Sequence, residues 1–236
     1  MKSSSSFFLE NRVDAILWKE GFYSEFQQLK KQLREGGNRE SDGNESIHQQ
    51  MIDAINNGIV FYQQLLEKTD PRDTALVYSI TIRLGDLHRY AGMEKLSQTS
   101  SPSTSTSSQT HNNPYYKASK SYYMHAQGLD PHQGMAYHGL ALLATYELAH
   151  CRAIYYYLRS AICRIPQKTA IQNIRVELEN NKRTLMEIVQ MQNATASRNS
   201  LHKKQSVNVC NMQFLEKMNL HLNLNLNIAI KYNVII

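Results

Sequence analysis

The sequence predicts an all-α fold in which antiparallel helices pack into an array. Large apolar residues recur every three or four positions up to about residue 90, which is the spacing of one helix face. In the second half, a pattern of tyrosine, alanine and proline recurs after 35 residues, close to the period of about 34 residues in tetratricopeptide helix pairs. No stretch approaches the roughly 20 apolar residues of a membrane span, so no membrane partner is expected.

Three helices are predicted in the first half of the chain. The first covers residues 11–35 and ends at a pair of glycines, after which a polar loop continues to residue 45. The second covers residues 45–68 and ends before an Asp-Pro pair, and the third runs from Val77 to about residue 90. Their apolar positions are Trp18, Phe22, Phe26, Leu29, Leu33, Ile47, Met51, Ile55, Ile59, Tyr62, Leu66, Val77, Ile80, Leu84 and Leu87.

The internal repeat predicts tetratricopeptide-type helices between residues 115 and 174. A small alanine lets two helices approach closely, an aromatic side chain fills the space beside it, and a proline ends the second helix. Because two copies are fewer than the three or so that such arrays need, we expect them to pack against the earlier helices and a further helix over 170–191. The repeated residues are Ala118, Tyr122, Ala126 and Pro131, followed by Ala153, Tyr157, Ala161 and Pro166.

Two segments have a composition that does not favour packing. Residues 97–114 form a run rich in serine and threonine, for which we expect a disordered loop that could be phosphorylated. This loop lies within one predicted domain, which covers residues 7–192. Residues 193–236 have a different composition, with a strand-like alternation over 220–230, and are interpreted as a divergent, disordered tail.

Signatures of catalysis are missing from the sequence. It contains no phosphate-binding glycine loop, dinucleotide fingerprint, zinc protease motif or serine hydrolase motif, so we expect neither an enzyme nor a cofactor. The nine histidines and three cysteines lack the spacing of metal ligands, so no metal site is expected. Glu177 and Glu179 are interpreted as residues of a solvated helix face. The net charge of +6 suits anionic partners.

Arg159 is the binding residue that the pattern suggests. It follows three tyrosines, residues 155–157, on a repeat helix. Core packing explains the tyrosines, and it remains the alternative for the whole block. The guanidinium of an arginine, however, stays charged and is costly to bury without an anionic partner. Its planar donors suit bidentate binding of a phosphate or carboxylate, so Arg159 is a candidate phosphate receptor.

Four stretches in sequence order resemble a known family. They are NRVDAILWKEGFYSEFQQLKKQL at residues 11–33, GIVFYQQLL at 58–66, LGDLHRY at 84–90, and a long stretch from Tyr116 to Asn173. Together they are similar to the N-terminal domain of the Est/SMG adaptors of nonsense-mediated mRNA decay and telomerase, over roughly residues 10 to 190. The opening and the pieces SxxYxxxAxxLxP and LALLA look most like the SMG-six type, also called Est-one A.

The resemblance implies a 14-3-3-like fold joined to tetratricopeptide-type helices, with a groove that binds a phosphoserine segment of the phosphorylated Upf-one RNA helicase. Arg159, within YYYxRS, falls on the family's phosphate-binding arginine, and Asn173, within AIQN, falls on a residue that holds the peptide backbone. The family's second phosphate-binding residue is a lysine that has no match in this chain, where Arg72 is the nearest basic residue. Losing one such contact is expected to weaken binding about tenfold to a hundredfold.

The resemblance also implies other partners and leaves other hypotheses open. A related adaptor would form a heterodimer, and telomerase RNA or telomeric DNA would bind a rival surface. Full members of the SMG-six type carry a PIN nuclease domain, which is lacking here, so no nuclease activity is expected. A cytoplasmic and nuclear protein is expected, although a truncated, inactive fragment is a further hypothesis. The rival surface consists of Lys30, Lys31, Arg34, Lys117, Lys120, Lys182 and Arg183.

Overall fold

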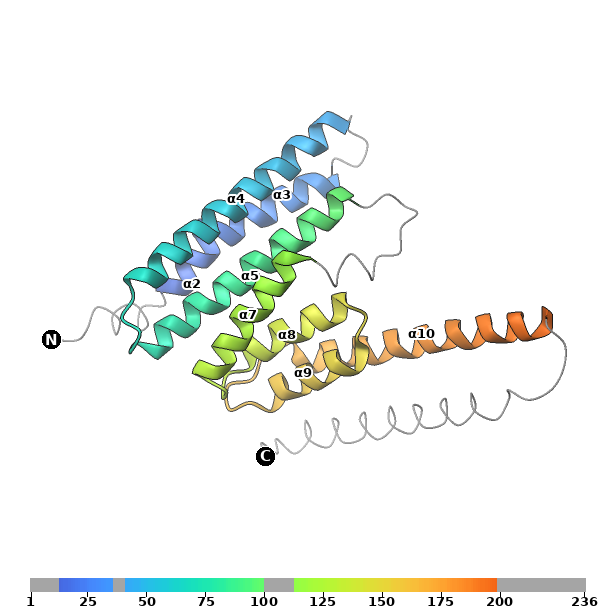
Figure 1. Ribbon diagram of the computed structural model, residues 1–236. Coiled ribbons are helices and arrows are strands. Elements are labelled where there is room, and N and C mark those ends of the chain that lie inside the picture. The colour runs from blue at the N-terminus through green and yellow to red at the C-terminus, as the bar shows by residue number, and fades with distance from the viewer. Residues whose placement is uncertain (1–12, 36–40, 100–112, 199–236) are drawn as a thin grey trace.

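The computed structural model describes residues 13–35, 41–99 and 113–198, and in this part of the chain every regular element is a helix (Figure 1). The prediction of an all-α array of antiparallel helices is therefore confirmed. The elements are α2 (Val13–Trp18), the π-helix η1 (Lys19–Tyr23), α3 (Ser24–Glu35), α4 (Ser41–Lys68), α5 (Thr74–Thr99), α7 (Pro114–Leu129), α8 (Gly134–Tyr146), α9 (His150–Ile162) and α10 (Ala170–Arg198).

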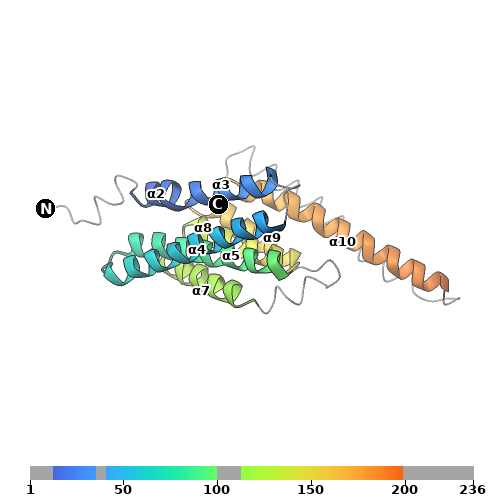
Figure 2. The ribbon, with the colours of Figure 1, turned by 90° about the horizontal axis from the view of Figure 1, so that it is seen from above.

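The first predicted helix is a rod of three parts, α2, η1 and α3, which lies along one side of α4 and α5 (Figure 2). Its apolar face is the predicted one. Phe22 and Phe26 are buried, and both of their rings pack against Tyr90 of α5, with centroids 6.4 and 4.7 Å away. A polar contact fixes the start of the rod, because Arg83 of α5 donates to Asp14 at 3.1 Å.

The helices α5, α7 and α8 approach one another closely because glycines face a tyrosine. The ring of Tyr123 on α7 lies between Gly85 of α5 and Gly139 of α8, where an added Cβ would come within 2.6 and 2.5 Å of it. The hydroxyl of Ser119 donates to the carbonyl oxygen of Gly85 at 2.7 Å. These contacts join the N-terminal helices to the repeat helices in one core.

The 35-residue repeat falls on α7 and α9 and on the turn that follows each helix. The turns lie side by side, since Gln133 and Ile165 form a parallel bridge. The amide of Ile165 donates to the carbonyl of His132 at 3.0 Å, and the amide of Gly134 donates to the carbonyl of Ile165 at 2.8 Å. Such parallel turns are expected when a second copy of a helix pair is stacked beside the first.

Several helices are longer than the apolar spacing predicts. The helix α4 starts four residues before the predicted residue 45, and α5 continues to Thr99 rather than to about residue 90. His48 near the start of α4 lies 3.0 Å from buried Glu94, which ties the added part of α5 to α4. The rest of the predicted loop, residues 100–112, and the tail from 199 to 236 lie outside the described residues.

The last helix, α10, continues to Arg198 and so passes the predicted domain end at residue 192. Its first turns are packed, with Ala170, Ile174 and Leu178 buried. Its second half projects beyond α8 and α9 (Figures 1 and 2). Within the described ranges, no helix combines the length and the apolar character that a membrane span needs.

Candidate functional site

Arg159 lies in the last turn of α9, with its side chain at the surface. Its Nη2 donates to the hydroxyl of Tyr137 at 3.3 Å, and its guanidinium carbon lies 5.2 Å from the centre of that ring. The Tyr137 hydroxyl raises the pKa of Arg159, so the guanidinium stays charged. Among the described residues, no carboxylate forms an ion pair with Arg159. A buried tyrosine on α8 therefore orients the cation, and no described carboxylate compensates its charge.

Hydrogen bonds to α8 and to the α9–α10 turn hold the last turn of α9 in place. The hydroxyl of Ser160 donates to the carbonyl of Gly134 at 2.7 Å, and the amide of Gln167 donates to the carbonyl of Ser160 at 3.4 Å. A Cβ at Gly134 would lie only 2.5 Å from that Ser160 carbonyl oxygen, so only glycine fits there without movement. These contacts fix the backbone next to Arg159.

Asn173 lies near the start of α10 and faces α8. Its Nδ2 is 3.0 Å from Nε2 of His138, and the hydroxyl of Thr169 is 3.1 Å from the same nitrogen. Burial lowers the pKa of His138 to about 4, so its ring is neutral near pH 7. The Nδ2 group of Asn173 can only donate, so Nε2 accepts and the ring proton is assigned to Nδ1. The structure links Arg159 and Asn173 through Tyr137 and His138, neighbours on α8, but brings no direct contact between them.

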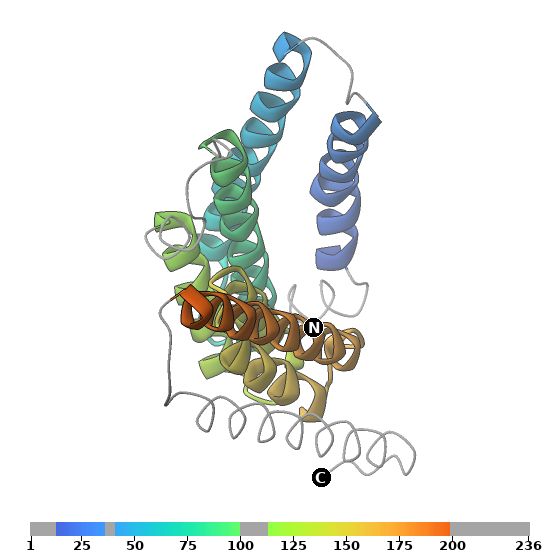
Figure 3. The same cartoon turned by 90° about the vertical axis from the view of Figure 1, so that its right-hand side faces the viewer.

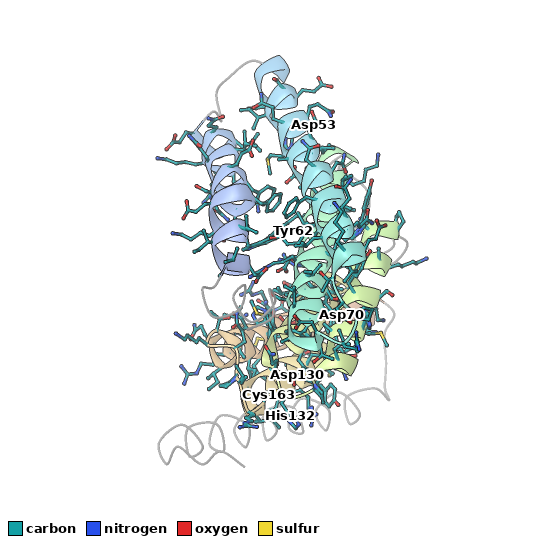
Figure 4. The ribbon with its side chains drawn as sticks, turned by 90° about the vertical axis from the view of Figure 1, so that its left-hand side faces the viewer. Asp53, Tyr62, Asp70, Asp130, His132 and Cys163 are labelled. Carbon is teal, nitrogen blue, oxygen red and sulfur yellow. The ribbon has the colours of Figure 1, made fainter. Side chains whose placement is uncertain are left out.

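Arg72 lies in the turn between α4 and α5 and is already paired. Its Nε and Nη2 donate to the two oxygens of Asp70 at 3.2 and 3.1 Å, which lowers the pKa of Asp70. Figure 4 shows Asp70 along the same edge of the molecule as Asp130 and Cys163, where the α7–α8 turn and the end of α9 also lie in Figure 1. Among the described residues, no contact joins Arg72 to Arg159.

The basic residues of the rival surface are divided among helices that lie apart. Those of α3 and those of α7 are on opposite sides of α4 and α5 (Figures 2 and 3). Lys30 on α3 is half-buried, with its ammonium 4.7 Å from the centre of the Phe26 ring, and burial lowers its pKa. Lys31 pairs with Glu35 at 3.7 Å. These residues do not form one continuous face.

The interpretation of Glu177 as a solvated residue is wrong. Its side chain is 2% exposed and lies 2.6 Å from Nδ1 of His150, while Thr145 donates to it at 3.2 Å. The next carboxylate, Glu179, is exposed as predicted. The apolar spacing of α10 did not reveal this pair, because the partner lies 27 residues earlier on α9. No cluster suited to a metal ion occurs in the described residues.

Comparison with known proteins points to one family. Residues 119–222 match the family described as the Est1 DNA/RNA binding domain, and this match reaches past the end of α10 into the segment that the sequence predicts as divergent. Telomerase-binding protein EST1A of Danio rerio is 26% identical over 180 residues, which cover 72% of this chain and 12% of that protein. Nonsense-mediated mRNA decay factor SMG7 of Arabidopsis thaliana is 34% identical over 103 residues, which cover 44% of this chain and 9% of that protein.

Proposed function

Because this chain is related to the Est/SMG adaptors, as its sequence predicts, we propose that it binds a phosphorylated protein segment in mRNA surveillance. The proposed partner is the phosphorylated Upf-one RNA helicase. The matches span only about a tenth of the length of the two relatives, so the activities of those whole proteins are not transferred. The observation that carries the proposal is the exposed guanidinium of Arg159, oriented by Tyr137 and without a carboxylate partner in the described ranges.

A phosphoserine would give Arg159 the anionic partner that no described carboxylate provides. It carries a charge of about −1.5 to −2 near pH 7 and offers three acceptor oxygens to a planar guanidinium. One charge-assisted contact of this kind contributes about 1.5 to 3 kcal/mol, or roughly a tenfold to hundredfold gain in affinity. Arg72 is proposed as a second contact, but it must exchange Asp70 for the phosphate, so its net gain is small. Asn173 is proposed to hold the peptide backbone.

Fluorescence anisotropy tests the proposal with the full chain, a phosphoserine peptide and its unphosphorylated twin. The wild type should bind the phosphopeptide at least about tenfold more tightly. Arg159→Gln should abolish that preference. Arg152→Gln is the matched control, because Arg152 lies on the same helix but is paired with Glu147 at 2.6 Å. Equal binding of both peptides by a folded wild-type chain would contradict the proposal.

The second candidate function is binding of telomerase RNA or telomeric DNA. The description of the matching family and the name of the zebrafish relative favour it. A nucleic-acid strand that binds the rival surface must contact separate helices. The logarithm of its association constant should fall by about 0.7 to 0.9 per phosphate contacted for each unit increase in the logarithm of the salt concentration. A single phosphoserine gives a much shallower dependence. An oligonucleotide titration at three salt concentrations separates the two functions.

Two further expectations belong to this proposal. The relatives are named for telomerase and for mRNA decay, so we expect the chain to act in the nucleus and the cytoplasm, and a related adaptor is a further proposed partner. The hypothesis of an inactive fragment requires that the helical core be incompletely packed. Circular dichroism should then show weak helicity and a non-cooperative thermal transition, whereas an intact core unfolds cooperatively.

A further inference from the structure

The end of α9 and the turn between α9 and α10 carry a basic cluster that extends beyond Arg159. From residue 159 to residue 176 the chain has four basic residues and no aspartate or glutamate. Three of them, Arg159, Arg164 and Lys168, surround the end of α9 and are exposed. Among the described residues, Arg164 and Lys168 form no ion pair. We call these three residues the basic turn.

Backbone contacts hold the basic turn together. The chain leaves α9 after Ile162, folds back, and returns to the last turn of α9 through the bond from the Gln167 amide to the Ser160 carbonyl. In between, Ile165 is bonded on both sides to the α7–α8 turn. Figure 4 shows His132 of that turn close to Cys163, at the same edge of the molecule. Arg164 and Lys168 therefore stand on fixed backbone beside Arg159.

The repeat itself shows that packing does not require these charges. Counted back by 35 residues, Arg159, Arg164 and Lys168 correspond to Met124, Leu129 and Gln133 in the first copy. All three are uncharged, although the first turn is parallel to the second and bonded to it. Neutral residues satisfy the packing at these positions in the first copy. The charges of the second copy are therefore free to serve binding.

Apolar side chains alternate with the cations. Ile162 and Ile165 are 50% and 56% exposed, and they lie between Arg159 and Lys168 along the chain. Single-stranded nucleic acids bind where bases stack on aromatic rings, and an isoleucine offers no such ring. A peptide that carries both acidic and apolar side chains matches the alternation better. The composition of the turn favours a peptide ligand over a nucleic acid.

We propose that the basic turn reads the sequence next to the phosphoserine. Arg159 binds the phosphate, and Arg164 and Lys168 bind a second anionic group of the same peptide, which is an acidic side chain or a second phosphate. Ile162 and Ile165 contact apolar residues between the two anionic groups. This inference rests on the proposed function of Arg159 and adds a preference to it. The preferred ligand is a phosphosegment with a further negative charge nearby.

The expected gain is moderate because both added contacts are exposed. Two such ion pairs should raise affinity by about three- to tenfold over a phosphopeptide with neutral flanks. The test measures anisotropy with the full chain and four labelled peptides. One has a phosphoserine with neutral flanks, one is the unphosphorylated twin of that peptide, one has acidic residues beside the phosphoserine, and one has two phosphoserines.

The test variant is Arg164→Gln with Lys168→Gln. Its matched control is Lys182→Gln with Arg183→Gln, which removes the same charge from exposed positions of α10. The wild type and the control variant should prefer the acidic or doubly phosphorylated peptide by about three- to tenfold. The test variant should lose this preference and still bind the neutral-flank phosphopeptide normally. If the wild type prefers only the acidic peptide, the second anionic group is a carboxylate. If it prefers only the doubly phosphorylated peptide, that group is a phosphate.

The inference is overturned if added negative charge gives the wild type no gain, or if the test and control variants lose the gain equally. Failure of the proposed function looks different, because the wild type then does not distinguish the neutral-flank phosphopeptide from its unphosphorylated twin. A single-stranded oligonucleotide provides the last arm. If the oligonucleotide binds through Arg164 and Lys168 while added charge on the peptide has no effect, the inference is overturned and the basic turn binds nucleic acid.

Discussion

Replacing Gly134 by alanine should disturb the fold directly behind Arg159. The new Cβ would lie 2.5 Å from the carbonyl oxygen of Ser160 and 2.8 Å from the amide nitrogen of Gln167. Both are backbone atoms, so no side-chain rotation can relieve the contact. The end of α9 and the start of the α9–α10 turn must therefore move away from α8.

The structure sets the size of this effect. Overpacking of this kind costs about 1 to 3 kcal/mol. The movement also weakens two hydrogen bonds, the 2.8 Å bond from the Gly134 amide to Ile165 and the 2.7 Å bond from Ser160 to the Gly134 carbonyl, each contributing about 1 kcal/mol. We expect Gly134→Ala to lower the free energy of unfolding by about 2 to 4 kcal/mol.

Gly128→Ala is the matched control. It lies in α7, where a new Cβ meets no atom within 4 Å, so alanine should raise stability by up to about 1 kcal/mol through its better helix propensity. Urea unfolding followed by circular dichroism measures both changes, and the phosphopeptide titration measures binding. Gly134→Ala should also reduce the preference for phosphopeptide, because Arg159 moves with α9. If Gly134→Ala had the same free energy of unfolding and the same phosphopeptide preference as the wild type, the steric conflict inferred at Gly134 would be refuted.

Three other predictions concern stability. The pKa of His138 in the folded chain, about 4, lies below its ordinary value of 6.5, so only the unfolded chain takes up a proton between these values. His138 should therefore lower stability by up to about 3 kcal/mol as pH falls from about 6.5 to 4, and urea titrations should find the loss smaller by that amount in His138→Gln. Leu148 has a positive φ of 55° and an exposed side chain, so its backbone is strained. Leu148→Gly should relieve this strain, stabilise the fold by about 1 kcal/mol and raise the melting temperature. A lower melting temperature in Leu148→Gly would contradict the presence of strain. Glu177→Ala should cost about 1 to 3 kcal/mol in urea unfolding, because it leaves His150 and Thr145 without their buried hydrogen-bond partner, whereas Glu179→Ala should stay within about 0.5 kcal/mol.

The first helices could be predicted because their buried apolar residues recur with helical spacing. The spacing of Phe22, Phe26 and Leu29 defines one helix face, and all three side chains are buried. The helix ends were harder, because polar contacts between distant residues decide them. The bond between His48 and Glu94 joins positions 46 residues apart, and no local pattern predicts such a pair.

The candidate site was predictable only in part, for a similar reason. The cost of burying a guanidinium predicts that Arg159 is exposed or paired, and the structure shows it exposed. Its partner Tyr137 lies 22 residues away on α8, and spacing gives no sign of that contact. The pairing of Arg72 with Asp70 was visible in principle, because the two residues are only two positions apart.

The repeat explains why the site lies at this edge of the molecule. Stacking a second helix pair beside the first places the two turns in parallel, and the bridge between Gln133 and Ile165 joins them. That bridge uses backbone atoms alone, so it does not depend on which side chains the exposed positions of the turns carry. The first turn has neutral residues at the three positions where the second has Arg159, Arg164 and Lys168. Charge could therefore be added to the second turn without loss of the fold, and the rigid backbone behind Gly134 keeps these cations in place.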